Sequence, residues 1–91
     1  MKYVIAYDLA DDRRRSRLVS LLLDYGARIQ ESVFYADLEE HFFSEMMERA
    51  GRLIEPELDV MNVFPLCAAC VERKAVVGKG RVPEYKEFYI V

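Results

Sequence analysis

Apolar and polar positions along the first part of the chain change their spacing from strand-like to helix-like. Residues 2–8 (KYVIAYD) are aromatic and β-branched in a run too short for a helix, so they predict a buried first strand. Over residues 13–25, apolar side chains recur at i, i+4 and i+7 spacing, which predicts an amphipathic helix. Asp11 or Asp12 offers this helix an N-terminal cap, and Gly26 offers it a left-handed C-terminal stop.

The rest of the chain alternates between the same two patterns. Residues 27–37 are strand-like around a polar centre and predict either two short antiparallel strands or one bent strand. Residues 40–54 predict a second helix. Residues 59–66 and 74–77 predict further strands, and residues 85–91 form a last β-prone segment. The apolar stripe of the second helix comprises Phe42, Phe43, Met46, Met47, Ala50, Leu53 and Ile54.

The order of these elements predicts an α+β fold. Strand, helix, strand, strand, helix, strand is the βαββαβ order of a ferredoxin-like sandwich, in which two helices cover one face of an antiparallel sheet. We expect residues 1–91 to form a single domain. The extra C-terminal strand, residues 82–91, has no obvious place in so small a sheet. We expect it to pack on the partner subunit of a homodimer, where it would cover a sheet edge.

Composition excludes several classes of protein. With 53% hydrophobic and 32% charged residues, the chain is neither disordered nor of low complexity. No apolar run approaches the roughly 18 residues that a membrane span needs. The apolar N-terminal segment lacks the features of a secretion signal, so we expect a cytoplasmic protein without membrane partners. Two cysteines are too few for a disulfide scaffold.

The charge of the chain is unevenly distributed. The net charge of −3 by itself argues against a nucleic-acid-binding domain, which is usually basic. However, residues 13–17 (RRRSR) hold four arginines and residues 72–87 hold five basic side chains, whereas residues 37–59 hold eight acidic ones. A basic face on one side of the molecule can still follow a phosphate backbone, in which case we expect the acidic second helix to face away from it.

Asp8 is the first candidate for chemistry, because it ends the first predicted strand. It can be a metal-binding carboxylate, or it can cap the following helix or simply be solvated. Mg²⁺ takes six oxygen ligands, commonly one or two protein carboxylates with several waters. A two-fold dimer that placed both copies of Asp8 near its axis would supply two carboxylates.

The arginines that open the first helix are the second candidate. Positive charge opposes the helix dipole at an N-terminus, so four arginines there call for an explanation. A phosphate backbone passing this turn would provide one. The alternative is a solvated face partly paired with nearby acids, which we favour for Arg13 and Arg14. For Arg15 and Arg17 both interpretations stay open.

Cys67 and Cys70 form a C-x-x-C pair. A structural zinc site needs four ligands, so one chain cannot complete it with this pair and the single histidine, His41. A thioredoxin-like role needs the motif to open a helix after a strand, which residues 65–66 do not clearly supply. We therefore expect two half-buried cysteines in a turn or, failing that, a labile disulfide. We expect His41 to be a cap or surface residue.

Four segments in combination resemble the CRISPR-associated protein 2 family: YVIAYDLADDRRRSRL, YGARIQESVFYADL, NVFPLC and VVGKG. The resemblance spans essentially the whole chain. It implies a ferredoxin-like homodimer that bridges two dimers of the integrase, CRISPR-associated protein 1. It also implies binding of a double-stranded DNA protospacer during spacer acquisition. An alternative is a stand-alone, toxin-like ribonuclease of the same fold, which would not require residues 82–91.

The resemblance also assigns residues. Members of the family are described as metal-dependent endonucleases acting on RNA or DNA, and Asp8 matches the position that binds Mg²⁺ in them. The matching accessory or nucleic-acid-binding positions are Tyr7, Arg15, Arg17, Arg28 and Phe34. We expect the strand aromatics to lie mostly in the core, although Phe34 could lie at a dimer surface. Tyr35 stands where many relatives carry glutamate, which puts any role of that carboxylate in doubt here.

Overall fold

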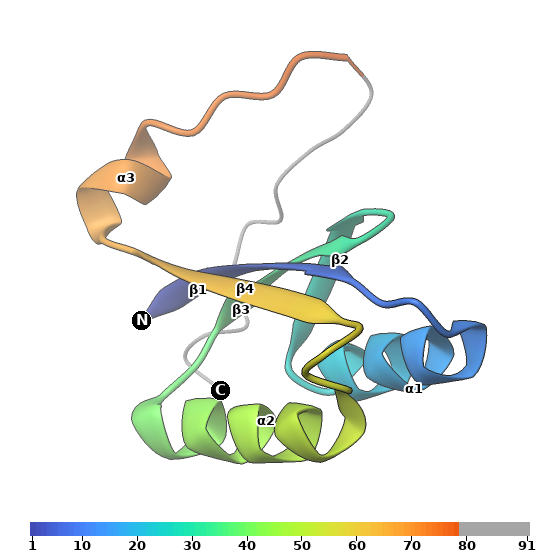
Figure 1. Ribbon diagram of the computed structural model, residues 1–91. Coiled ribbons are helices and arrows are strands. Elements are labelled where there is room, and N and C mark those ends of the chain that lie inside the picture. Colours follow the sequence, from blue (N-terminus) through green and yellow to red (C-terminus); the bar gives the residue numbers. More distant parts are fainter. Residues whose placement is uncertain (79–91) are drawn as a thin grey trace.

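An antiparallel sheet with strand order β2-β3-β1-β4 forms the centre of the protein (Figure 1). The structure, a computed structural model, describes residues 1–78. Its elements are β1 (Lys2–Asp8), α1 (Asp12–Leu23), β2 (Gly26–Gln30), β3 (Val33–Asp37), α2 (Glu40–Leu53), β4 (Val60–Leu66) and α3 (Ala68–Glu72). All three strand pairings are antiparallel, so the predicted α+β, ferredoxin-like order is confirmed.

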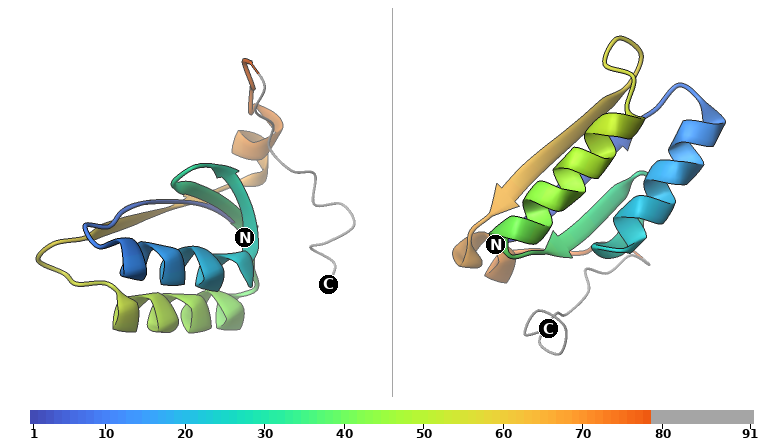
Figure 2. Two further views of the ribbon diagram at one scale, coloured as in Figure 1. Left: turned by 90° about the vertical axis from the view of Figure 1, so that its right-hand side faces the viewer. Right: turned by 90° about the horizontal axis from the view of Figure 1, so that it is seen from below.

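Helices α1 and α2 lie side by side on one face of the sheet, and the core lies between them and the strands (Figure 2). Alternate strand residues point to this face, as the two-residue period of a strand requires. The helices contribute every third or fourth residue. The fully buried side chains include Ile5, Leu9, Leu18, Leu22, Phe34 and Met46. The two apolar faces thus bury each other, and this burial holds the end of β1 rigidly over α1.

The predicted helix bounds are nearly correct, but the role predicted for Gly26 is wrong. Asp11 caps α1 by accepting a hydrogen bond from the Arg14 N–H at 2.9 Å. The helix ends at Leu23, and Gly26 is the first residue of β2, without a positive φ. A Cβ on Gly26 would lie 2.4 Å from the Tyr35 carbonyl oxygen. Glycine is therefore needed here for close strand packing rather than for a left-handed stop.

The apolar stripe of α2 is wider than the surface that the core covers. Met46 and Ala50 are fully buried, and three other members of the stripe pack beside the core. Phe42 and Met47 are instead 40% and 36% exposed. Their assignment to the core is wrong, because the stripe spans more of the helix circumference than one sheet face can contact.

The chain after β4 differs from the prediction. Residues 74–77 form no strand, and Val77 is 97% exposed. Apolar β-branched residues form a strand only where a neighbouring strand accepts their hydrogen bonds, and no described strand lies beside this segment. An unpredicted helix, α3, comes first. The predicted segments 82–91 and 85–91 lie outside the described residues, so their packing stays a prediction.

Helix α3 also corrects the expectation for the cysteines. Cys67 caps α3 and Cys70 lies in its first turn, so the pair does open a helix directly after a strand. Both cysteines are exposed rather than half-buried in a turn. The sequence hid this arrangement because five residues are too few to show a helical period.

The sheet face opposite α1 and α2 is only partly covered. Helix α3 lies on this side (Figure 1). Tyr35, which lines a small cavity together with Cys70 and Val71 of α3, is 2% exposed. At the other end of β4, Val60 is 46% exposed, and Phe64 in the middle of the strand is 53% exposed. We refer to the uncovered part around Val60 and Phe64 as the open sheet face. Among the described residues, no helix has the length and apolar character to cross a membrane.

Candidate functional site

Asp8 lies at the carboxyl end of β1, where the strand leaves the sheet and turns toward α1. Its side chain is exposed and makes no hydrogen bond or ion pair with any described residue. It borders an open cleft of about 520 Å³. The other residues that line this cleft, called the Asp8 cleft below, are Tyr7, Leu9, Arg15, Arg28, Glu31 and Ser32. The fold thus brings four of the six residues predicted for the site into one cleft.

The turn between β2 and β3 forms one wall of the Asp8 cleft. The Tyr7 hydroxyl donates to the Glu31 carbonyl at 3.1 Å, and the Arg28 Nε donates to the same carbonyl at 2.9 Å. The backbone N–H of Tyr7 donates to the Ser32 carbonyl at 3.2 Å. Tyr7 and Arg28 therefore hold this turn in place beside Asp8. Arg28 is exposed, which leaves its remaining N–H groups available to an anion.

Arg15 reaches the Asp8 cleft from the first turn of α1. Its Nη2 donates to the Leu9 carbonyl at 2.9 Å, and its Nη1 pairs with the Asp12 carboxylate. The first contact fixes the backbone immediately after Asp8. The Arg15 side chain is still 43% exposed, and a guanidinium has five N–H donors in total. Two guanidinium groups with spare donors therefore flank a free carboxylate.

Phe34 and Arg17 lie outside the Asp8 cleft. Phe34 is 0% exposed, and its ring centroid lies 6.2 Å from that of Tyr7. The expectation that Phe34 lies at a dimer surface is wrong, because its side chain points from β3 toward the helices. It supports Tyr7 from below the cleft. Arg17 lies in a separate groove between α1 and α2.

The groove that contains Arg17 is shallow, has a volume of about 670 Å³ and lies between α1 and α2. It is called the helix groove below. Its charged lining residues are Arg13, Arg17, Asp24, Arg49 and Arg52. Arg49 pairs with Asp24 at 3.3 Å, and Arg52 pairs with Glu48 at 3.2 Å. The side chains of Arg13 and Arg17 make no hydrogen bond or ion pair with a described residue. The helix groove is therefore cationic, although α2 lies in the acidic part of the sequence.

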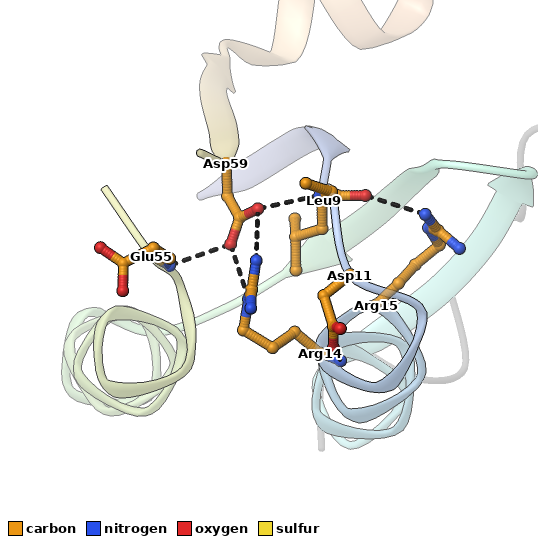
Figure 3. A network of polar contacts seen from close by, with 7 residues as sticks. Leu9, Asp11, Arg14, Arg15, Glu55 and Asp59 are labelled. Atoms are coloured by element: carbon orange, nitrogen blue, oxygen red, sulfur yellow. Dashed lines mark hydrogen bonds and ion pairs between the residues drawn. The ribbon is translucent and has the colours of Figure 1, made fainter. Parts of the chain in front are cut away.

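A polar network that sequence analysis missed lies next to the Asp8 cleft (Figure 3). The Asp59 side chain is 0% exposed and accepts hydrogen bonds from the Arg14 Nε at 2.9 Å and Nη2 at 3.0 Å. The backbone N–H groups of Ala10 and Glu55 also donate to it, each at 2.9 Å. Asp59 thus ties the segment after β1 to the segment between α2 and β4.

The network has clear electrostatic consequences. Hydrogen bonds from Arg14, followed by those from the two backbone groups, hold the pKa of Asp59 far below its ordinary value. The same contact raises the pKa of Arg14. The structural interpretation of Arg14 is supported, but its partner is Asp59 rather than Asp11 or Asp12. No local signal could reveal this pair, since 45 positions separate the two residues.

The described residues do not by themselves form a complete metal centre. They contain no group of three or more histidine, cysteine, aspartate or glutamate side chains that could hold a metal ion. Asp8 nevertheless has the properties of a Mg²⁺ ligand, since it is an exposed carboxylate for which no residue in the described range 1–78 competes. Asp8 can supply one protein ligand to Mg²⁺. Water, phosphate or a second chain would supply the other ligands.

Comparison with known proteins places this geometry in a family. A family model described as CRISPR associated protein Cas2 matches residues 1–74. The CRISPR-associated endoribonuclease Cas2 1 of Chloroflexus aurantiacus is 39% identical over 93 residues, covering 100% of both chains. The CRISPR-associated endonuclease Cas2 2 of Thermus thermophilus is 39% identical and covers 98% of this chain and 94% of its own.

A solved structure agrees with these matches. The hypothetical protein TT1823 from Thermus thermophilus superposes with a TM-score of 0.81 at 37% sequence identity. The superposition covers 91% of this chain and 96% of that protein. A solved Cas2 structure superposes with a TM-score of 0.69 at 26% identity and covers 92% of this chain and 93% of its own, so the fold agrees with the family match. The chain belongs to the CRISPR-associated Cas2 family.

Proposed function

We propose that this chain is a metal-dependent endonuclease of the CRISPR system that binds the phosphodiester backbone of RNA or DNA in the Asp8 cleft. One observation carries the proposal: an exposed carboxylate that no described residue contacts lines an open cleft together with two arginines. Relatives named endoribonuclease and endonuclease support it. A buried carboxylate with a full set of donors, such as Asp59, would have no capacity left for a metal or substrate.

The residues of the cleft have distinct roles in this proposal. Asp8 would hold Mg²⁺, and the bound metal would supply Lewis-acid chemistry by polarising the phosphate and activating a water. Arg15 and Arg28, from α1 and β2, would donate to the non-bridging oxygens of the scissile phosphate, where negative charge develops. Tyr7 positions the β2–β3 turn through its hydroxyl, and Phe34 supports the Tyr7 ring.

A homodimer would complete the metal site. The open sheet face exposes Val60 and Phe64, which is costly for an isolated chain and favours a second copy as its cover. Asp8 is the direct partner of Val60 in the register of β1 and β4, so it lies at the margin of this face. Packing two open sheet faces about a two-fold axis would bring both Asp8 side chains toward each other. Two carboxylates with water and phosphate oxygens satisfy Mg²⁺.

The helix groove favours a second function, that of an adaptor in spacer acquisition. In this function the dimer bridges two dimers of the integrase Cas1 and holds a double-stranded DNA protospacer. Arg13 and Arg17 offer charges that pair with no residue of the described part of the chain and lie outside the Asp8 cleft, so they could hold a DNA backbone without cleaving it. Membership of the CRISPR-associated family supports this role. Both functions are expected in the cytoplasm, where nucleic acid and partner proteins meet.

Cleavage of labelled duplex DNA and single-stranded RNA tests the nuclease. Wild type and Asp8→Asn are compared with Mg²⁺ and with a chelator. Glu40→Gln serves as the matched control, because it neutralises an exposed carboxylate at the start of α2. The nuclease proposal expects metal-dependent cleavage by wild type and Glu40→Gln, and its loss in Asp8→Asn with the dimer intact by light scattering.

The same experiment decides between the functions. If wild type does not cleave, or Asp8→Asn cleaves equally well, the nuclease proposal fails and the adaptor remains. The adaptor then predicts Cas1 binding and duplex binding that weaken in Arg17→Ala. Deleting residues 82–91 distinguishes both functions from a toxin-like ribonuclease, because only such a ribonuclease would stay active as a monomer after the deletion.

A further inference from the structure

Cys67 and Cys70 place two exposed thiols against each other at the start of α3. Their Sγ atoms are 3.4 Å apart. Cys67 caps the helix, and the Val71 N–H donates to the Cys67 carbonyl at 3.1 Å, so the backbone of the first turn fixes the two side chains on the same side. Both cysteines are open to solvent and hence to small thiol reagents.

We propose that Cys67 and Cys70 form a reversible intramolecular disulfide, which makes the first turn of α3 a thiol-oxidation site. The two sulfurs already touch, and closing them to the disulfide bond length of about 2.0 Å needs only side-chain rotation within one helical turn. None of the site residues discussed above takes part. The inference therefore stands independently of the proposed nuclease and adaptor functions.

The two thiols have different roles in this reaction. Polar contact with the Cys70 backbone and thiol lowers the pKa of Cys67, whereas contact with Cys67 raises the pKa of Cys70. Cys67 is therefore the attacking thiolate and Cys70 the resolving thiol. This order matches the usual division of labour in C-x-x-C motifs.

A small disulfide such as oxidised glutathione is the oxidant. The Cys67 thiolate attacks one sulfur of glutathione disulfide, forms a mixed disulfide and releases one glutathione thiolate. Cys70, after losing its proton to solvent, attacks the Cys67 sulfur and releases the second glutathione. The protein loses two protons and two electrons, and one glutathione disulfide becomes two glutathione thiols.

The disulfide would act on the sheet face that α3 covers. Cys70, Val71 and Leu66 line a small apolar cavity of about 110 Å³ together with Val4 and Tyr35. Linking Cys70 to the end of β4 through Cys67 would fix the first turn of α3 over Tyr35. Oxidation is therefore expected to slow local opening of α3, which amide hydrogen exchange of Val71 and Glu72 would record as increased protection.

The experiment equilibrates the full-length chain with glutathione redox buffers, quenches with an alkylating agent and measures intact mass. We expect both thiols to disappear together, without disulfide-linked multimers on non-reducing gels, and to return with dithiothreitol. Cys70→Ser should accumulate a glutathione adduct on Cys67. Cys67→Ser should react with glutathione disulfide at least about 10-fold more slowly.

Three results would overturn the inference. Both thiols could stay alkylatable in excess glutathione disulfide, or oxidation could yield only cross-linked multimers. Alternatively, added Zn²⁺ could protect the thiols at one ion per two chains, which would identify a shared zinc site instead. Circular dichroism of both serine variants checks that they keep the fold, so a failure to react cannot be attributed to unfolding.

Discussion

Two aspartates at the same end of the sheet differ completely in their surroundings. Asp8 ends β1 and Asp59 immediately precedes β4, and Asp8 pairs with the next residue, Val60, in the strand register. The Asp59 side chain is 0% exposed and receives four hydrogen bonds, two of them from Arg14. The Asp8 side chain is exposed and receives none from the described residues.

The difference separates a structural carboxylate from a functional one. Asp59 has its charge neutralised and its oxygens occupied, so it can join segments but cannot bind a ligand. The acceptor sites of the Asp8 carboxylate are left open by every described residue. Arg14 and Arg15 repeat the contrast one residue apart, since Arg14 is committed to Asp59 whereas Arg15 reaches into the Asp8 cleft. The prediction is that substitutions at the two aspartates affect different properties.

Thermal stability should show the largest contrast. Asp59→Asn should lower the melting temperature by about 10 °C or more, because charge-assisted hydrogen bonds are lost and Arg14 keeps an uncompensated charge. Asp8→Asn should change it by less than about 2 °C, as expected of an exposed residue without contacts. Circular dichroism melts of the two variants at pH 7 provide the measurement. Equal melting temperatures would remove the distinction between the two sites.

The role of Asp59 should also appear in acid unfolding, with a smaller effect than on the melting temperature. The folded pKa of Asp59 lies well below its ordinary value of 3.8, so its contribution to stability is complete above that value and decreases as pH falls below it. Denaturant unfolding of wild type should therefore become easier from about pH 4 downward.

Asp59→Asn lacks this titrating group, so its stability should fall less steeply over the same acid range. Asp11, whose pKa is also lowered through its cap contact with Arg14, continues to contribute in both proteins. If the stability of Asp59→Asn fell with pH as steeply as that of wild type, this result would contradict the assignment of the Asp59 network.

Salt dependence of nucleic-acid binding should show the smallest effect. Arg15→Ala and Arg28→Ala should each reduce the slope of log K against log salt by about 0.9, because each removes one phosphate contact. Arg73→Ala, at the end of α3, removes an exposed charge outside the cleft and should leave the slope unchanged. Binding is measured by fluorescence anisotropy with a labelled duplex over a salt series. A slope unchanged in all three variants would exclude the Asp8 cleft as the binding surface.

Local pattern was enough to predict most of the fold. The helices over residues 12–23 and 40–53 and the strand over residues 60–66 follow from hydrophobic periods that tertiary contacts reinforce. The polar centre of residues 27–37 became the turn of two antiparallel strands, the first of the two alternatives. The sequence did not predict the five-residue helix α3, and it wrongly predicted a strand at residues 74–77. Both outcomes depend on which segments lie beside these residues.

The candidate site divides in the same way. The sequence alone determined that Asp8 ends a strand and that arginines open the next helix, since both depend only on order along the chain. Only the tertiary structure decided that Arg28 joins Arg15 at Asp8, that Arg17 lies in the helix groove, and that Arg14 is bound to Asp59. Periodicity is a local property that the chain carries in its order. Which charges meet depends on packing between segments far apart, and this packing is established only when the sheet and helices close on each other.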